Sequence, residues 1–371
     1  MRIGIDAFWY FDGYSSLKRV TSNLVDYLIR NDPKNEYVLF IDKNAANQIF
    51  SFELGSRIKI RYLKVGSLKY NFLVKLFVLP YFSYVDKIDV LVTQYYPSPF
   101  SRGRRVVFIY DILYEDFPHL FTRQERYQLW PQKVLSKWAH GIITISQSEK
   151  ERILKFRYVS RPEKVAVFSL AADKRFKPKS SFLPKKLAEV KLKYNLPDEF
   201  LLYVGLLSGR KNLDNLIRAL PMIKVDIPLV IIGNGHPTYA SNHWALINQL
   251  NLKKRVIFTG FVSDDDLPAL YALAKVFCFP SFAEGFGLPP LEAISSGIPV
   301  AVSNQTSLPE VCGDAGIYFE PDNPNQIAKS IEELVLNESL YQEKSNICNI
   351  QAAKFNWDNS AKIILHFLEK I

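Results

Sequence analysis

A strand–helix alternation that occurs twice constrains the fold of this chain most strongly. Short apolar, β-branched runs in the first half predict strands at residues 2–7, 36–41, 58–63, 89–93, 105–110, 141–145 and 165–168. A polar stretch rich in proline and lysine at residues 173–186 predicts a linker. The alternation then restarts, with strands predicted at residues 200–204, 229–232, 256–259, 276–279, 299–302 and 316–319. Helical segments separate most of these runs, which is typical of parallel sheets covered by helices.

This double alternation predicts an α/β protein with two Rossmann-like domains that face each other across a cleft. A chain of 371 residues is long enough for two domains of ordinary size. Ligands of such sheets bind beyond the carboxyl ends of the strands. We therefore expect the functional residues in the loops that follow the strands.

Hydropathy and cysteine usage indicate a cytoplasmic protein without a membrane span. The chain contains no run of about 18 apolar residues. Asp6 interrupts the short apolar run at the N-terminus, which reads as a buried strand and not as a signal peptide. The three cysteines, Cys278, Cys312 and Cys348, are odd in number and scattered, which fits a reducing compartment.

The charge is unevenly distributed along the chain. Residues 1–178 contain 29 Lys/Arg and 17 Asp/Glu, whereas the remainder contains 18 and 20. A basic half suggests an anionic membrane surface, a phosphorylated acceptor or nucleic acid as partner, and scattered solvated lysines are the alternative. The aromatic and basic residues 64–87 suggest a membrane interface or an acceptor contact, or else a core helix with one wet face. No recognisable nucleic-acid-binding module is present, so we expect no nucleic acid partner.

Residues 284–292 carry two carboxylates on either side of a glycine turn and a proline-started helix. Glu284 lies on the turn, and Glu292 falls about one turn into the helix, on the side that faces back. A helix N-terminus offers N–H groups and a partial positive charge to an anion. Carboxylates accept strong, charge-assisted hydrogen bonds from hydroxyls. The segment therefore suits a ligand with hydroxyls at both ends and a negative middle, such as a nucleoside diphosphate sugar.

Arg210 and Lys211 form a second candidate element, at a strand-to-helix turn. A guanidinium binds phosphate bidentately and an ammonium acts as a point charge. The alternative is a solvated basic pair, although cations at a helix N-terminus oppose the helix dipole. Gly233, at the end of another strand, allows close backbone approach to a ligand or serves a simple tight turn. Asp111 ends a strand of the first half, where it either meets the ligand from the other side or caps a turn.

The sequence shows no pattern for a metal or a cofactor. The five histidines have no metal-ligand spacing, and no Cys/His cluster or carboxylate triad stands out. We expect no bound metal and no cofactor, so Arg210 and Lys211 would have to neutralise a diphosphate leaving group.

These motifs together resemble the family-4 retaining glycosyltransferases, which have the GT-B fold. The strongest match is residues 276–303, followed by residues 308–316. Weaker matches, which bring the coverage close to the whole chain, lie at residues 142–146, 205–213, 233–235 and 260–267. Within the family, the chain is similar to bacterial polysaccharide mannosyltransferases.

The resemblance implies roles by position. Glu284 would contact hydroxyls of the donor sugar, and Glu292 would bind the ribose. Arg210 and Lys211 would stabilise the departing diphosphate. Asp111 would belong to the catalytic residues. The remaining donor-binding positions are turn, helix-start and base-side residues, namely Gly285, Phe286, Gly287, Leu288, Gly233, Phe261 and Val262.

The resemblance also implies domain boundaries. The terminal helix from Trp357 would cross back onto the N-terminal domain. The acceptor-side domain would comprise residues 1–175 and 356–371, and the nucleotide-sugar domain residues 176–355. Two positions depart from the family pattern. Tyr110 precedes Asp111 where similar proteins often have histidine, and only Gly13 is retained from a glycine-rich loop after the first strand.

The function implied is a metal-independent retaining hexosyltransferase. It would move a hexosyl unit, weakly favoured as mannose from GDP-mannose, to a hydroxyl of a glycan or lipid-linked saccharide. Contact with the inner face of the cytoplasmic membrane would follow if the basic half meets anionic lipid. The alternatives are a nucleotide-sugar epimerase or a phosphorylase on the same frame, and a non-catalytic GT-B partner subunit.

Overall fold

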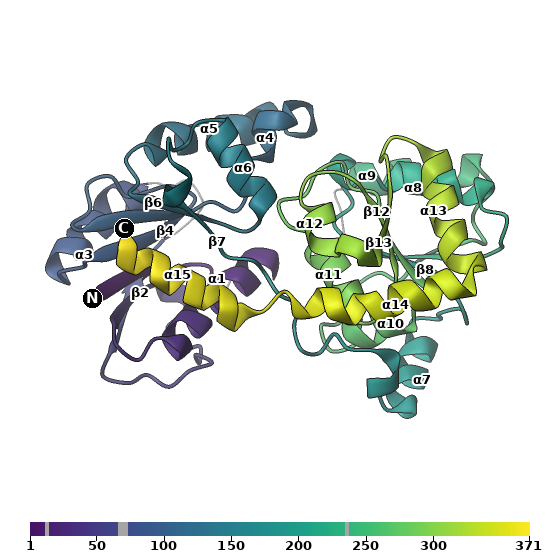
Figure 1. The fold of residues 1–371 in the computed structure, drawn as a ribbon, viewed down its shortest axis with the longest axis horizontal. Helices are drawn as coiled ribbons and strands as arrows, with labels where there is room; N and C mark the ends of the chain where they lie inside the picture. Colours follow the sequence, from purple (N-terminus) through teal and green to yellow (C-terminus); the bar gives the residue numbers. More distant parts are fainter. Residues whose placement is uncertain (12–14, 66–72, 234–236) are drawn as a thin grey trace. The chain divides into compact units, whose positions relative to one another are not determined.

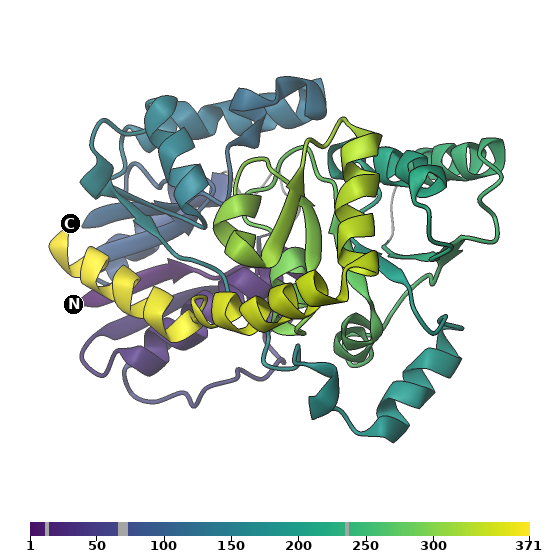
Figure 2. The same ribbon diagram turned by 45° about the vertical axis from the view of Figure 1, so that its right-hand side comes forward.

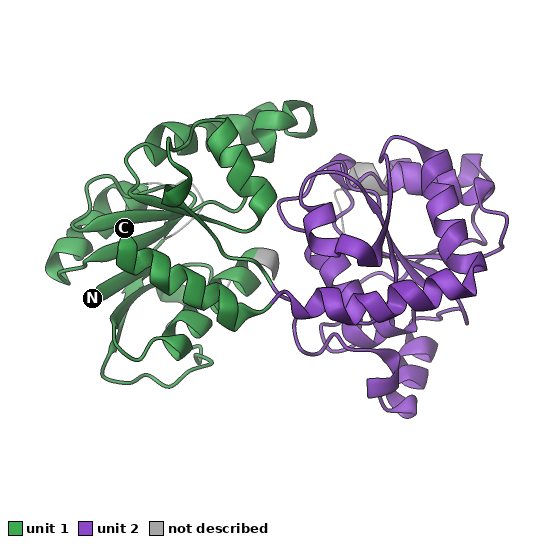
Figure 3. Ribbon diagram, viewed as in Figure 1, with its two compact units in different colours: residues 1–170, 356–371 green, residues 171–355 purple. Residues whose placement is uncertain are grey.

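The computed structural model describes residues 1–371 except 12–14, 66–72 and 234–236. The chain divides into two compact units, residues 1–170 with 356–371 and residues 171–355 (Figure 3). The sequence placed the first boundary after residue 175. Gly13 and part of the aromatic stretch 64–87 lie outside the described residues.

Unit 1, residues 1–170 with 356–371, is built on a seven-stranded sheet in the order β3-β2-β1-β4-β5-β6-β7 (Figure 1). Every neighbouring pair is parallel. The strands are β1(Arg2–Asp6), β2(Glu36–Asp42), β3(Ile58–Leu63), β4(Val90–Gln94), β5(Arg104–Phe108), β6(Gly141–Thr144) and β7(Val165–Val167). The α-helices are α1(Ser15–Asn31), α3(Leu79–Val85), α4(Leu113–Asp116), α5(Arg123–Ser136), α6(Gln147–Lys155) and α15(Trp357–Lys370).

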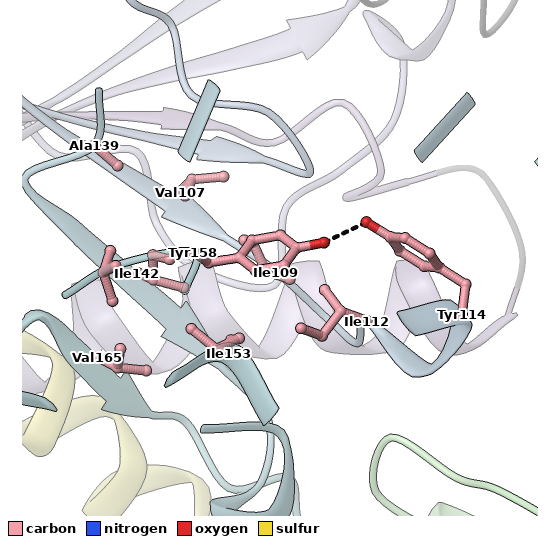
Figure 4. Close-up of a cluster of buried hydrophobic side chains, with 10 residues drawn as sticks. Val107, Ile109, Ile112, Tyr114, Ala139, Ile142, Ile153, Tyr158 and Val165 are labelled. Atoms are coloured by element: carbon pink, nitrogen blue, oxygen red, sulfur yellow. Dashed lines mark hydrogen bonds between the residues drawn. The ribbon is translucent and has the colours of Figure 1, made fainter. Parts of the chain in front are cut away.

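The core of unit 1 forms where helices cover both faces of its sheet. Helices α1 and α15 lie on one face, and α5 and α6 lie on the other (Figures 1 and 2). On the α5 and α6 side, Ile109, Ile142 and Ile153 are fully buried in one cluster (Figure 4). The hydroxyls of Tyr114 and Tyr158 form a hydrogen bond inside this cluster, so each has a polar partner although it is buried away from water.

The C-terminal helix α15 belongs to unit 1. Its buried residues Ala361, Ile364 and Leu368 recur at helical spacing. Trp357 packs its ring 6.3 Å from that of Tyr27 on α1 and 5.5 Å from that of Phe168. This amphipathic helix, the last of the chain, therefore packs beside α1 on the sheet that the first part of the chain forms.

Unit 2, residues 171–355, is built on a six-stranded parallel sheet in the order β10-β9-β8-β11-β12-β13. Its strands are β8(Leu201–Val204), β9(Leu229–Ile232), β10(Val256–Phe258), β11(Val276–Phe279), β12(Val300–Ser303) and β13(Gly316–Phe319). Its α-helices are α7(Pro184–Lys193), α8(Leu213–Ala219), α9(Pro237–Gln249), α10(Leu267–Leu273), α11(Leu288–Ser295), α12(Leu308–Cys312), α13(Pro324–Leu336) and α14(Glu338–Ala353).

Both sheets have a point where the chain reverses its direction of travel. In unit 2 the chain runs outward from β8 to β10, and then from β11 to β13 in the opposite direction. Neighbouring strands β8 and β11 therefore send their following helices to opposite faces, and parallel sheets commonly bind ligands at such a point. The thirteen strands predicted from sequence are all confirmed, each within one or two residues at its ends. Among the described residues, no helix combines the length and the apolar character needed to cross a bilayer.

Candidate functional site

The candidate site of unit 2 lies at the reversal point of its sheet. The loop after β8 carries Arg210 and Lys211, and the loop after β11 carries Glu284. The two loops are joined by backbone contacts, because Phe282 N–H donates to the Arg210 carbonyl at 2.9 Å. Asn212 strengthens this junction, since its side-chain amide donates to the Pro280 carbonyl at 2.9 Å. The site therefore has a rigid base.

Arg210, Lys211 and Glu284 form one ion cluster. Lys211 Nζ donates to Glu284 Oε1 at 2.6 Å, and Arg210 Nη1 lies 3.2 Å from Glu284 Oε2. Arg210 Nη1 also donates to the Ala283 carbonyl at 2.5 Å. Lys211 lies 4.8 Å from the centre of the Phe279 ring, a favourable place for a desolvated cation. Arg210 and Lys211 are thus 74 and 73 positions from Glu284 in the sequence but meet it at one sheet edge.

Glu284 is buried but charged. Burial by itself would raise the pKa of its carboxyl, but the charges of Lys211 and Arg210 outweigh burial and lower the pKa to about 2. At neutral pH this side chain is therefore a hydrogen-bond acceptor and not a proton donor. A carboxylate held in this state is suited to sugar hydroxyls and unsuited to general acid catalysis.

The peptide that carries Glu284 is held by two residues that the sequence reading missed. Glu284 N–H donates to Thr306 Oγ1 at 2.9 Å, and Ser307 Oγ donates to the carbonyls of Glu284 and Phe286 at 2.9 and 2.6 Å. Thr306 itself adopts a left-handed backbone, with φ of 56°. A serine just before the helix-starting residues 308–309 reads as an ordinary cap, so only the tertiary contacts reveal this positioning role.

Gly287 begins helix α11 in a conformation that excludes other residues. Its φ is 111°, and a Cβ at this position would lie 2.9 Å from Leu308 Cδ2. The next residues include Pro289 and Pro290, which have no N–H. The N–H groups that this turn can present to an anion therefore lie before Pro289, and the sequence nominated those of Phe286, Gly287 and Leu288.

Glu292 lies within α11 and is buried. Its Oε2 accepts a hydrogen bond from the Tyr271 hydroxyl at 3.0 Å. Tyr271 is in turn stacked on Phe277 at 5.6 Å, which fixes the direction of its hydroxyl. One carboxylate oxygen is thus oriented by the protein. Tyr271 is a second positioning residue without a local sequence signal.

The other predicted donor-binding residues of unit 2 lie in the loops after β9 and β10. Gly233 packs against backbone, since a Cβ here would lie 1.8 Å from the Gly205 carbonyl oxygen. The close approach at Gly233 is thus between two strand-end loops, a contact that the sequence did not predict. Phe261 is 79% exposed, whereas Val262 beside it is buried. An exposed ring on the ligand edge of a sheet is available for stacking.

Asp111 belongs to unit 1, where it follows β5 and is half-buried. The next residue, Ile112, donates its N–H to Glu149 Oε2 at 3.0 Å, so a buried side chain of α6 holds the backbone after Asp111. Burial and then the charge of Asp111 raise the pKa of Glu149. Tyr110, the departure from the family pattern named above, is buried with its hydroxyl 3.2 Å from Thr21 Oγ1. Its hydroxyl is therefore used inside unit 1.

The described residues contain no group of three or more His, Cys, Asp or Glu side chains that could hold a metal ion. The three cysteines are buried and unpaired with one another. Burial raises the pKa of the Cys278 and Cys312 thiols, so these groups are inert at neutral pH.

Acid should weaken unit 2 through Glu284. Its pKa of about 2 lies below the ordinary value of 4.5, so the folded state holds the ionised form more tightly than the unfolded state does. The resulting stability is present above about pH 5 and is lost as the pH falls towards 2, with a magnitude on the order of 3 kcal/mol. Urea unfolding from pH 6 to pH 3 should show a steeper decline for the native protein than for Glu284→Gln. Equal slopes would contradict the strong ion cluster.

Solved structures with similar backbones define the class of fold. Sucrose-phosphate synthase from Thermosynechococcus elongatus superposes with a TM-score of 0.76 and 19% identity, over 100% of this chain and 98% of that chain. WaaG, a glycosyltransferase involved in lipopolysaccharide biosynthesis, superposes with a TM-score of 0.72 and 16% identity over 100% of both chains. The chain has the GT-B fold, as predicted.

Sequence comparison matches part of the chain to a family model. Residues 185–355 match the model of "Glycosyl transferases group 1", so this part of the chain is a glycosyltransferase group 1 domain. The serotype-specific mannosyltransferase WbdA of Escherichia coli is 36% identical over 232 residues, 61% of this chain and 28% of WbdA. The O-antigen chain mannosyltransferase B of Escherichia coli is 35% identical over 59% of this chain and 57% of its own length.

A third relative extends further along the chain. The O-antigen chain mannosyltransferase RfbU of Salmonella typhimurium is 26% identical over 75% of this chain and 73% of its own length. The matched regions thus span 28% of the length of WbdA and 57% of that of mannosyltransferase B. The predicted resemblance to bacterial polysaccharide mannosyltransferases is confirmed.

Proposed function

We propose that this chain is a metal-independent retaining glycosyltransferase that moves a mannosyl unit from GDP-mannose to a hydroxyl of a glycan or lipid-linked saccharide. The observation that carries the proposal is the cluster of Arg210, Lys211 and Glu284 at the reversal point of the unit 2 sheet. It combines two cations for a diphosphate with an ionised acceptor for hydroxyls.

The cations act on the leaving group. The acceptor oxygen forms a bond to the anomeric carbon while the bond from that carbon to the diphosphate oxygen breaks. The acceptor proton passes to the departing phosphate oxygen, on the same face of the sugar. Negative charge grows on that phosphate, and Arg210 and Lys211 supply fixed positive charge beside it. Glu284 remains ionised at neutral pH and orients the sugar through its hydroxyls.

The sugar and the acceptor are proposed from the relatives. WbdA, mannosyltransferase B and RfbU are named as mannosyltransferases, the last two of O-antigen chains. Growth of such a chain on a lipid carrier would bring the enzyme to the cytoplasmic face of a membrane, where the basic unit 1 suits anionic lipid.

A donor screen tests the proposal. UDP-, GDP-, ADP- and dTDP-sugars are incubated with acceptor, and nucleotide release is scored. We expect release with GDP-mannose, and an α-linked product by NMR, since the donor is an α-anomer. An epimerised donor without acceptor would support an epimerase, and dependence on phosphate would support a phosphorylase. Absence of GDP and UDP binding in calorimetry would indicate a non-catalytic subunit.

Variants of the two carboxylates, Glu284 and Glu292, should differ in their effects on GDP binding and on turnover. If Glu292 binds the ribose, Glu292→Gln should weaken GDP binding about 10- to 100-fold, because a hydrogen bond to a charged acceptor is lost. Glu284→Gln should keep the GDP affinity within a few-fold of the native value and should lower kcat, because Glu284 is proposed to contact the sugar, which GDP lacks. Calorimetry with GDP and initial rates with the donor measure both.

Tyr271→Phe is the matched control for this comparison. It removes only the hydroxyl that orients Glu292 Oε2, so GDP affinity should fall less than in Glu292→Gln. A loss of GDP affinity in Glu284→Gln equal to that in Glu292→Gln would contradict the assignment of sugar and ribose ends.

A further inference from the structure

Helix α5 of unit 1 and the two residues after it expose a row of large apolar side chains, most of them aromatic. Tyr127, Trp130, Val134 and Trp138 recur at intervals of three and four residues, and the two tryptophans are 52% and 53% exposed. Phe100, from the loop before β5, extends the row, with its ring 6.4 Å from that of Trp138. We call these five residues the aromatic stripe. Rings of this kind are costly in water, and Trp and Tyr favour the boundary between lipid and water.

A basic cavity lies beside the C-terminal end of this stripe. It has a volume of about 550 Å³, and its lining includes Lys137, Arg157, Lys164 and Ser160. In the part of the chain that the structure describes, none of these three cations has a carboxylate within 4.0 Å. Lys137, which lines the cavity, is next to Trp138 in the chain, so the cavity adjoins the C-terminal end of the stripe.

The local electrostatics agree with an unneutralised basic surface. His140 lies two residues beyond Trp138, and burial together with the charges of Arg105, Lys164 and Arg104 lowers its pKa. Unit 1 as a whole contains 28 Lys/Arg and 18 Asp/Glu. An anion next to the aromatic stripe would relieve this accumulation of positive charge.

The aromatic helix α3 provides an informative contrast. Its side chains Tyr81 and Tyr84 are also exposed, as is Phe77 just before it. Two cations near them, Lys59 and Arg61, are already paired, however. Asp86, at the end of α3, binds Lys59 at 2.6 Å and Arg61 at 2.7 Å.

Lys75 of the same segment, residues 64–87, is buried. It lies 3.1 Å from Asp6 Oδ2 and is 3% exposed, so it cannot contact a surface. Lys75 therefore adds no charge to the exposed surface of this segment.

We propose that the aromatic stripe and the basic cavity together dock unit 1 on an anionic lipid bilayer, with phosphate headgroups in the cavity. The proposal rests on the proposed function, because a lipid-linked acceptor requires the enzyme at a membrane. The rings would sit among the headgroups and upper acyl chains, and Lys137, Arg157 and Lys164 would bind the lipid phosphates. The cavity lies at the amino-terminal ends of β6 and β7. It is thus at the opposite sheet edge from Asp111.

Vesicle sedimentation of the full-length chain tests the proposal. Phosphatidylcholine vesicles with phosphatidylglycerol should bind the protein, vesicles of pure phosphatidylcholine should bind it much less, and added salt should weaken binding. Trp130→Ala with Trp138→Ala should reduce the partition coefficient at least about tenfold, because two rings that would be buried in the bilayer are lost. Lys137→Gln, Arg157→Gln and Lys164→Gln together should reduce it about 100-fold.

Matched variants control for charge and for aromatic content. Lys253→Gln, Lys254→Gln and Lys329→Gln remove the same charge from exposed positions of unit 2 and should bind nearly as the native protein does. Phe77→Ala with Tyr81→Ala removes two exposed rings and should also bind nearly normally. Equal losses in these controls, or native binding by the α5 variants, would overturn the assignment.

GDP binding in calorimetry separates this proposal from the proposed function. All variants should bind GDP as the native protein does, which also shows that they fold. Vesicle binding with the expected variant pattern but no sugar transfer would leave the docking surface valid and refute the function. Transfer without vesicle binding would refute the docking surface. A dimer in solution that Trp130→Ala with Trp138→Ala dissociates would instead show an interface between copies.

Discussion

Arg210→Ala is expected to lower kcat about 10²- to 10³-fold while leaving the fold intact, because one fixed positive charge at the leaving phosphate is lost. Lys211 still pairs with Glu284 at 2.6 Å in this variant, so the buried carboxylate keeps a partner. The melting temperature should therefore change little. Initial rates of nucleotide release measure the effect, and Arg218→Ala, at an exposed position on the neighbouring helix α8, is the control. Near-normal turnover in Arg210→Ala would refute the proposed role.

Lys211→Ala should lose both turnover and stability. Lys211 is buried with Glu284, so its removal leaves a buried carboxylate with only the more distant Arg210. Breaking a buried ion pair in this way costs about 3 kcal/mol or more. The double variant Lys211→Met with Glu284→Gln removes both charges and should recover most of the stability but none of the turnover. Recovery of turnover as well would mean that Lys211 acts only through the fold.

Gly233→Ala is expected to destabilise the protein by at least about 3 kcal/mol. The new Cβ would lie 1.8 Å from the Gly205 carbonyl oxygen, and the backbone of two strand ends would have to move apart. The loop of Arg210 and Lys211 begins at Gly205, so GDP binding should weaken in the same variant. Urea unfolding and calorimetry measure the two effects.

Two other glycines calibrate this prediction. Gly260 has a φ of 70° but open space around a Cβ, so Gly260→Ala should cost only about 1 kcal/mol from backbone strain. Gly55 has neither constraint, so Gly55→Ala should be nearly neutral. If Gly233→Ala and Gly260→Ala cost the same, the contact with Gly205 is relaxed in solution.

The central strands of both sheets were predictable from the sequence because they are buried on both faces. Runs such as β9(Leu229–Ile232) and β11(Val276–Phe279) are wholly apolar, because a strand that is buried on both faces has no solvent-exposed position for a polar residue. Such continuous apolar runs are easily recognised in the sequence. The site on unit 2 was also signalled locally. Gly287 followed by prolines is a turn and helix start that few other structures allow.

The positioning residues of the site were not predictable in the same way. Thr306, Ser307 and Tyr271 act through hydrogen bonds to residues 21 to 23 positions away. Nothing in their local sequence marks these partners, since a serine just before a helix start reads as a cap and a tyrosine on a helix reads as core. Gly233 was predicted to approach a ligand or to form a tight turn, and its contact with the Gly205 backbone had no local signal.

The sequence by itself determined the two parallel sheets, the GT-B fold and the pair of motifs at Arg210–Lys211 and Glu284–Glu292, because each rests on burial pattern or turn chemistry within a short stretch. Only the tertiary structure decided that Arg210 and Lys211 share one buried carboxylate. It also decided that Lys75 is buried while the aromatic stripe of α5 is exposed beside unpaired cations. Charge pairing and exposure depend on which strands become neighbours, and a linear pattern does not encode that information.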